Sequence, residues 1–95
     1  MGLMMVGSQE RQKTRNEIID FEKRIEEMQL EFGKFRHGGR ETMPDWEGLE
    51  REIFIFSKRK IFDLELSKNL DRIMFKFQTR KKIWIQWAEE YHHNI

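Results

Sequence analysis

LEREIFIFSKRKIFDLELSKNLDRIMFKFQTRKKIWIQWAEEYHHNI, residues 49–95, is a stretch without a single glycine or proline. Apolar side chains recur along it at helical spacing, so the sequence predicts a long helix here. Projected at about 100° per residue, however, these side chains fall on two faces, rotated by roughly 140° about the helix axis. A straight helix with two such faces needs two packing partners, and this requirement decides the fold.

The change of face follows a polar segment at residues 57–60. The first face comprises Trp46, Leu49, Ile53, Phe56 and Leu64. The second comprises Leu66, Leu70, Ile73, Phe77, Trp84, Ala88 and Tyr91. Two structures fit this pattern: one continuous helix over about 45–92, or a helix that breaks near 57–60 or 67–69 and folds back as the third helix of a compact monomer. Because no glycine or proline marks a break, we predict the continuous helix.

The N-terminal half contains a more regular apolar pattern. Its side chains alternate at intervals of three and four residues, the spacing of a helix that packs along another helix. They are Ile18, Phe21, Ile25, Met28, Phe32 and Phe35. We expect this helix to cover about residues 8–37, after a disordered tail at 1–7. The two glycines at 38–39 should end it, because glycine adopts the left-handed conformation easily. A connection at 38–44 then leads to the second helix, with Thr42 as its N-cap.

The composition fits one small helical domain, residues 8–95. The chain has 95 residues, of which 37% are charged and 13% are aromatic, with a net charge of +1. This aromatic content exceeds that of a typical disordered chain, and the near-neutral charge argues against a simple arm for binding polyanions. A short connection joins antiparallel helices. We therefore predict an all-α fold, an antiparallel helical hairpin with a long second helix.

The lengths of the two predicted helices do not match. A first helix that starts at residue 8 covers the second only to about Phe75, and the remaining four turns, roughly 25 Å, would project into water. An aromatic patch of this size is larger than soluble monomers usually expose. Its predicted partner-binding residues are Phe77, Trp84, Trp87 and Tyr91. We expect this end to complete a helical bundle with another chain, either a second copy in a homodimer or a larger protein.

The predicted function is therefore non-catalytic protein–protein interaction or assembly. On this hypothesis, changing Trp84 and Trp87 together to alanine dissociates the assembly and leaves most of the helicity intact, because the aromatic end serves the partner and not the fold.

A basic stretch in the same helix provides the alternative function. Basic side chains interleaved with aromatic ones are typical of proteins that bind nucleic acid through phosphate contacts and base stacking. The candidate residues are Arg72, Lys76, Arg80, Lys81 and Lys82. They would make the chain a small helical subunit of a nucleoprotein complex. The competing interpretation is a solvated face whose long side chains shield the apolar stripe beside it.

No motif for catalysis, metal binding or membrane insertion is present. The serines lack a nucleophile-elbow context, and the glycine pair follows a helix instead of a strand, so it is not a phosphate loop. Glu89 and His92 have the Glu-x-x-His spacing of di-iron bundles, but terminal histidines beside the helix dipole explain them better. Residues 75–87 mix basic and apolar side chains without one clean polar face, which disfavours a membrane-surface helix. We expect no enzyme activity, cofactor or metal, and a cytoplasmic location.

Overall fold

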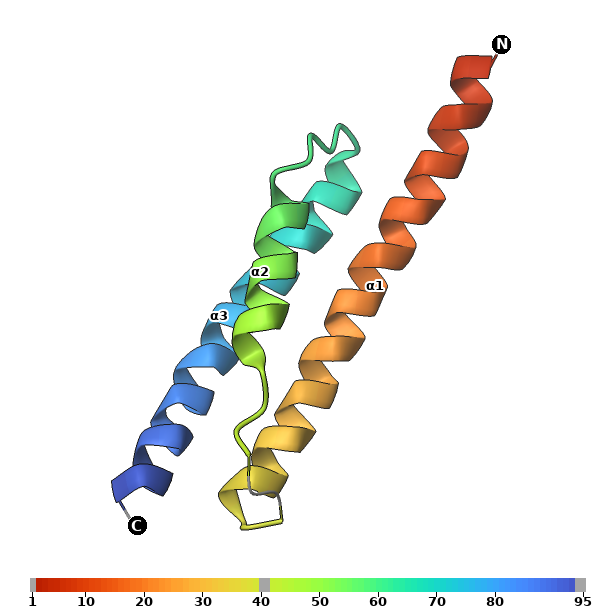
Figure 1. Cartoon of the computed structure of the whole chain (residues 1–95). Coiled ribbons are helices and arrows are strands. Elements are labelled where there is room, and N and C mark those ends of the chain that lie inside the picture. Colours follow the sequence, from red (N-terminus) through yellow and green to blue (C-terminus); the bar gives the residue numbers. More distant parts are fainter. Residues whose placement is uncertain (1, 40–41, 94–95) are drawn as a thin grey trace.

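The computed structural model describes the backbone of residues 2–39 and 42–93 and the side chains of residues 9–39 and 42–91. Within these residues the secondary structure is entirely helical, without a strand, so the predicted all-α class is confirmed. The helices are α1 (Gly2–Arg36), α2 (Trp46–Ser57) and α3 (Leu64–His93). They form a rod with extents of 62 × 19 × 17 Å (Figure 1).

The helices alternate in direction along the rod. Figure 1 shows that α2 runs antiparallel to α1, as the predicted hairpin requires, and that α3 then returns parallel to α1. Ring contacts mark both interfaces: the centroids of Phe21 and Phe56 lie 5.3 Å apart between α1 and α2, and those of Phe32 and Trp84 lie 5.1 Å apart between α1 and α3. The chain therefore supplies the third helix of a bundle itself.

The predicted continuous helix over 45–92 is wrong. α2 ends at Ser57 and α3 begins at Leu64, so the break lies at the first of the two alternative places in the sequence. Polar side chains bind backbone groups on both sides of the break. At the end of α2 the Ser57 hydroxyl donates to the carbonyl of Phe54 (2.6 Å), and at the start of α3 the Asp63 carboxylate accepts from the backbone N–H of Leu66 (3.0 Å). Folding back turns both apolar faces inward, and burying them outweighs the few helical hydrogen bonds lost in the loop.

The two ends of α1 differ in how well they were predicted. The stretch predicted as a disordered tail continues the backbone of α1, which begins at Gly2 instead of Ser8. Extending an existing helix through leucine and methionine requires no new nucleation. At the other end Gly38 has a φ of 81° and Gly39 donates to the carbonyl of Lys34 (2.7 Å). The predicted glycine C-cap is therefore confirmed.

The N-cap of α2 is Asp45 and not the predicted Thr42. The Asp45 carboxylate accepts a hydrogen bond from the backbone N–H of Gly48 (3.0 Å). An aspartate at this position both satisfies a free N–H group and places a negative charge at the positive end of the helix dipole. Pro44 is buried just before the helix begins.

A single apolar core runs the length of the bundle. Its buried members are Ile18, Phe21, Ile25, Phe32 and Phe35 from α1, Leu49, Ile53 and Phe56 from α2, and Leu66, Leu70, Ile73, Phe77 and Trp84 from α3. The predicted stripe of α1 is confirmed, with Met28 partly buried at its edge. On α2 and α3 the two predicted apolar faces pack against the core. The exception is Leu64, which is exposed.

Candidate functional site

Trp84, a predicted partner-binding residue, is buried in the chain's own core. Its side chain is 0% exposed and stacks on Phe32 with an interplanar angle of 2°. Its indole N–H donates to the side-chain oxygen of Gln29 (2.8 Å), so the one polar atom of the ring is satisfied. Phe77 is also buried and meets Trp84 edge to face. Trp84 therefore offers no surface to a partner, and Phe77 is only 1% exposed.

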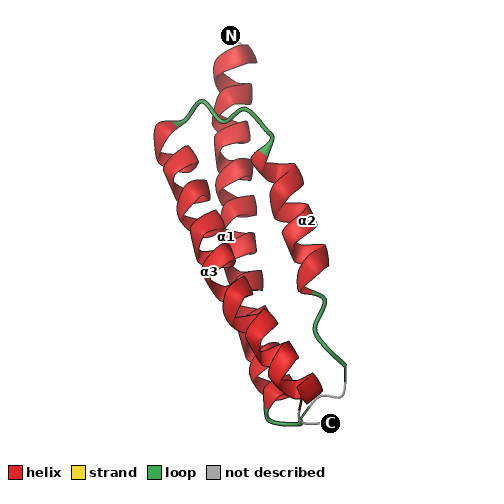
Figure 2. Cartoon of the chain, turned by 90° about the vertical axis from the view of Figure 1, so that its left-hand side faces the viewer, coloured by secondary structure: helices red, strands yellow, loops and turns green. Residues whose placement is uncertain are grey.

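The other two predicted partner-binding residues are half-buried against α1. The ring of Tyr91 lies 4.5 Å from that of Phe35, and the guanidinium of Arg36 lies 4.9 Å from the centre of the Trp87 ring. The expected overhang of this end is therefore absent, because α3 runs parallel to α1 and the two helices end together. The projecting turns belong instead to the N-terminal end of α1, which extends past the α2–α3 loop (Figure 2).

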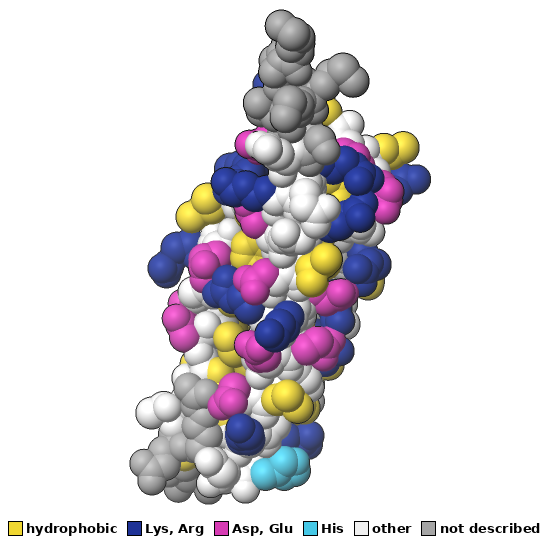
Figure 3. All heavy atoms as spheres, turned by 90° about the vertical axis from the view of Figure 1, so that its right-hand side faces the viewer, with side chains coloured by type: hydrophobic (Ala, Val, Ile, Leu, Met, Phe, Trp, Pro, Cys, Tyr) yellow, Lys and Arg dark blue, Asp and Glu magenta, His cyan; other side chains and the backbone are white. Residues whose placement is uncertain are grey.

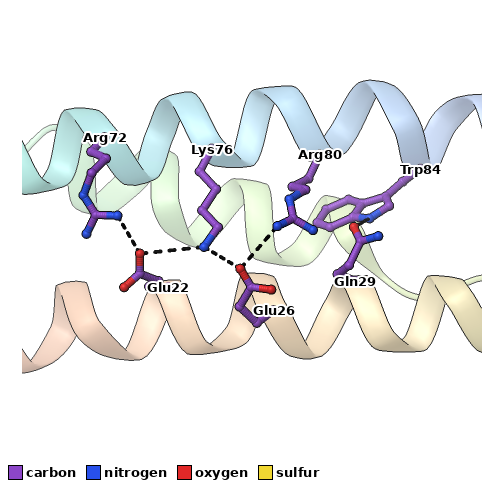
Figure 4. A network of polar contacts seen from close by, with 7 residues as sticks. All are labelled: Glu22, Glu26, Gln29, Arg72, Lys76, Arg80 and Trp84. Atoms are coloured by element: carbon purple, nitrogen blue, oxygen red, sulfur yellow. Dashed lines mark hydrogen bonds and ion pairs between the residues drawn. The ribbon is translucent and has the colours of Figure 1, made fainter.

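The basic residues predicted to contact nucleic acid form an ion-pair ladder between α1 and α3 (Figure 4). Arg72 binds Glu22 (2.7 Å), and Arg80 lies 3.4 Å from Glu26. Lys76 stands between them, ion-paired to Glu26 and 3.8 Å from Glu22. The spacing of four residues on both helices repeats the contact at each turn, as it does in parallel helix pairs.

The remaining two basic candidates differ in their surroundings. Lys81 binds Glu50 (2.6 Å), and its ammonium lies 5.2 Å from the centre of the Trp46 ring. Lys82 is exposed. Basic and acidic side chains also intermingle on the side of the molecule formed by α1 (Figure 3). Four of the five candidates are thus ion-paired to carboxylates of this chain, and nucleic acid contact stays a prediction.

The ladder lowers the pKa of both of its glutamates. For Glu22 the main cause is the hydrogen bond from Arg72, and for Glu26 it is the hydrogen bond from Lys76, each opposed by partial burial. A carboxyl group whose pKa is lower in the folded chain stabilises the fold above its unfolded pKa of about 4.3. That contribution is lost as the pH falls through the folded pKa.

Changing Glu22 and Glu26 together to glutamine should lower the free energy of unfolding at pH 7 by about 1 kcal/mol, since pairs this exposed are largely screened by solvent. The difference from the wild type should shrink as the pH falls below about 4.3, because the wild-type carboxyls become protonated. Urea unfolding at a series of pH values measures this. The matched control, Glu10→Gln with Glu89→Gln, removes two exposed charges outside the ladder. A deficit that persists unchanged at low pH would show that the ladder charges are not its cause.

Apolar surface remains on the outside of α2 and α3, where sequence reasoning had not placed a site. Phe54 is 56% exposed, Phe75 is 75% exposed, and Ile55 is exposed as well. These side chains lie off both predicted stripes, so treating apolar residues outside a stripe as candidates for contact would have found them. In the loop between the helices Phe62 is 92% exposed.

A groove of about 360 Å³ lies between α2 and α3, and we call it the α2–α3 groove. Its apolar lining consists of Trp46, Ile53, Phe54, Met74 and Phe77. Glu47, Glu50 and Arg51 add charged groups to the lining. The arrangement of apolar walls with charged groups at hand is typical of a surface that receives side chains of another protein.

Among the described residues, no group of three or more histidine, cysteine, aspartate or glutamate side chains comes together in a way that could hold a metal ion. The side chains of His92 and His93 lie outside the described residues. Nor does the described part include a helix with the length and apolar character needed to cross a membrane.

Comparisons of the chain with protein families, with curated proteins and with solved structures find no match.

Proposed function

We propose that this chain is a non-catalytic interaction subunit that docks through the α2–α3 groove. The observation that carries this proposal is Phe54, which is more than half exposed yet lines the groove beside the half-buried Trp46 and Met74. An aromatic anchor next to a preformed apolar cavity is the usual centre of a protein interface. Covering such a ring contributes about 25 cal/mol for each Å² of apolar surface removed from water.

The charged side chains between the helices support a structural role for the polar surface. Arg24 of α1 is ion-paired to Glu52 of α2, and Arg59, just after α2, lies 2.8 Å from Glu17 of α1. These groups serve the packing of the bundle. The groove differs from them, because it offers apolar area that the chain itself leaves uncovered.

A photo-crosslinking side chain tests the proposal. Phe54→benzoylphenylalanine should give a protein adduct in native cell extract, whereas Lys82→benzoylphenylalanine, on the exposed face of α3, should not. Adding Met74→Glu to the first variant places a charge in the groove lining and should abolish the adduct. Equal adducts from both positions, or an adduct that survives Met74→Glu, would contradict docking at the α2–α3 groove.

A further inference from the structure

One exposed stripe of α2 has opposite charges at its two ends. Glu47, Arg51, Phe54 and Lys58 follow one another at intervals of four, three and four residues, so they lie along one side of the helix. All four are exposed. We call them the α2 stripe. It lies on the side of α2 opposite to the buried residues Leu49, Ile53 and Phe56.

The α2 stripe is complementary to itself when two copies meet antiparallel. Glu47 and Lys58 lie equally far from the middle of the stripe, as do Arg51 and Phe54. A two-fold axis through that middle therefore sets Glu47 opposite Lys58 of the second copy, and Arg51 opposite Phe54 of the second copy. Each of these contacts occurs twice.

The aromatic ring at the centre already accepts a cation on one side. The ammonium of Lys58 lies 4.5 Å from the centre of the Phe54 ring. Arg51 of the second copy would approach the same ring from outside. A guanidinium that lies over the face of an aromatic ring is attracted to it. Glu47 lies one turn before Arg51 on the same stripe. The second copy therefore brings a negative charge close to the two cations at the ring, Lys58 and its own Arg51.

We propose that the partner docked at this surface is a second copy of this chain, held by antiparallel packing of the two α2 stripes. This inference rests on the proposed function, because Glu47, Arg51 and Phe54 of the α2 stripe also line the α2–α3 groove, and it names the occupant of that shared surface. Along the α2 stripe the order is acidic, basic, aromatic, basic. A foreign protein would have to present the same four groups in the opposite order. A second copy presents that order by symmetry.

Charge reversal tests the pairing with the full-length chain. Sedimentation equilibrium of the wild type should give a mass twice that of the 11.8 kDa chain at high concentration. Glu47→Lys alone, or Lys58→Glu alone, should raise the dimer dissociation constant roughly ten-fold, since each turns two attractive contacts into repulsive ones. The double reversal should return it to within roughly two-fold of the wild type. Lys82→Glu, on the exposed face of α3, should leave it unchanged.

The double reversal also separates pairing between copies from effects within one copy. Each single reversal opposes the dipole of α2, because Glu47 lies in its first turn and Lys58 follows its last. Those effects add in the double variant, so its melting temperature should fall below that of either single variant while its dimer recovers. If the dissociation constant of the double variant rises by the sum of the two single effects on the binding free energy, the proposal is overturned. Thermal melting of a dilute, monomeric sample of each variant controls for effects on folding.

The outcomes also distinguish this inference from the function on which it rests. If the purified chain stays monomeric at every concentration, the inference is wrong. In that case a Phe54 adduct to a different protein would leave the proposed function standing. A monomer that also forms no specific adduct at Phe54 would overturn both.

Discussion

Trp84→Ala is expected to lower the free energy of unfolding by about 4 kcal/mol, a large share of the stability of a domain this small. The indole is fully buried, and it packs against Phe32 from α1 and Phe77 from its own helix. Its removal leaves a cavity in the core. It also leaves the side chain of Gln29 without the hydrogen-bond donor that it faces. Urea unfolding followed by far-ultraviolet circular dichroism measures the change.

Trp87→Ala is the matched control, since it removes the same side chain from the same helix. Trp87 is only half-buried and is covered by the guanidinium of Arg36, so we expect a loss of about 1 kcal/mol. Equal losses for the two variants would mean that Trp84 is not the more deeply packed of the two.

The sequence alone predicts a different outcome for the same substitutions. With an overhanging aromatic end, a variant that lacks both Trp84 and Trp87 dissociates from a partner and keeps its helicity. With Trp84 inside the chain's own core, the double variant should instead lose helicity cooperatively at a lower urea concentration. Partner loss and unfolding are thus separable in a single experiment.

A chain that ends at residue 63 is expected to lose its cooperative fold entirely. It lacks α3, which contributes Trp84, the largest fully buried side chain of the described residues, and makes most of the contacts with α1. The remaining α1 and α2 would expose one side of the core along its whole length, and isolated helices are marginal in water. The thermal melt, followed by circular dichroism, should be broad and without a sigmoidal transition.

A separate peptide of residues 64–95 provides the control for this truncation. Mixing it with the shortened chain restores the missing apolar face, so helicity beyond the sum of the two components should return. A sharp melt of the shortened chain alone would show that α1 and α2 form an independent hairpin. The sequence-based fold would then be correct for the first 63 residues.

The helical class and the packing face of α1 were predictable because local patterns specify them. The three-and-four spacing from Ile18 to Phe35 marks one face, and that face is buried. The end of α1 was equally local, since Gly38 adopts a positive φ that other residues avoid. The packing face and the end of a helix depend on the residues of that helix and its cap, whichever element packs against it.

The sites were less predictable, because a side chain's type does not reveal its partner. Arg72, Lys76 and Arg80 form the same ladder whether phosphates or carboxylates face it. Only the packing of α3 against α1 places Glu22 and Glu26 opposite them. Phe54 likewise belongs to neither apolar stripe, and its exposure beside a groove depends on how α2 lies against α3.

By itself, then, the sequence determined that the chain is helical, where α1 ends, and which residues of each helix face a core. Tertiary structure decided that the long second helix breaks at residues 58–63, that α3 returns parallel to α1, and that Trp84 is core. The physical reason is one of scale. Breaking a helix without glycine or proline changes the local free energy by only a few hydrogen bonds of about 1 kcal/mol each. Burying a second apolar face contributes several times more, and that gain exists only once the helices pack together.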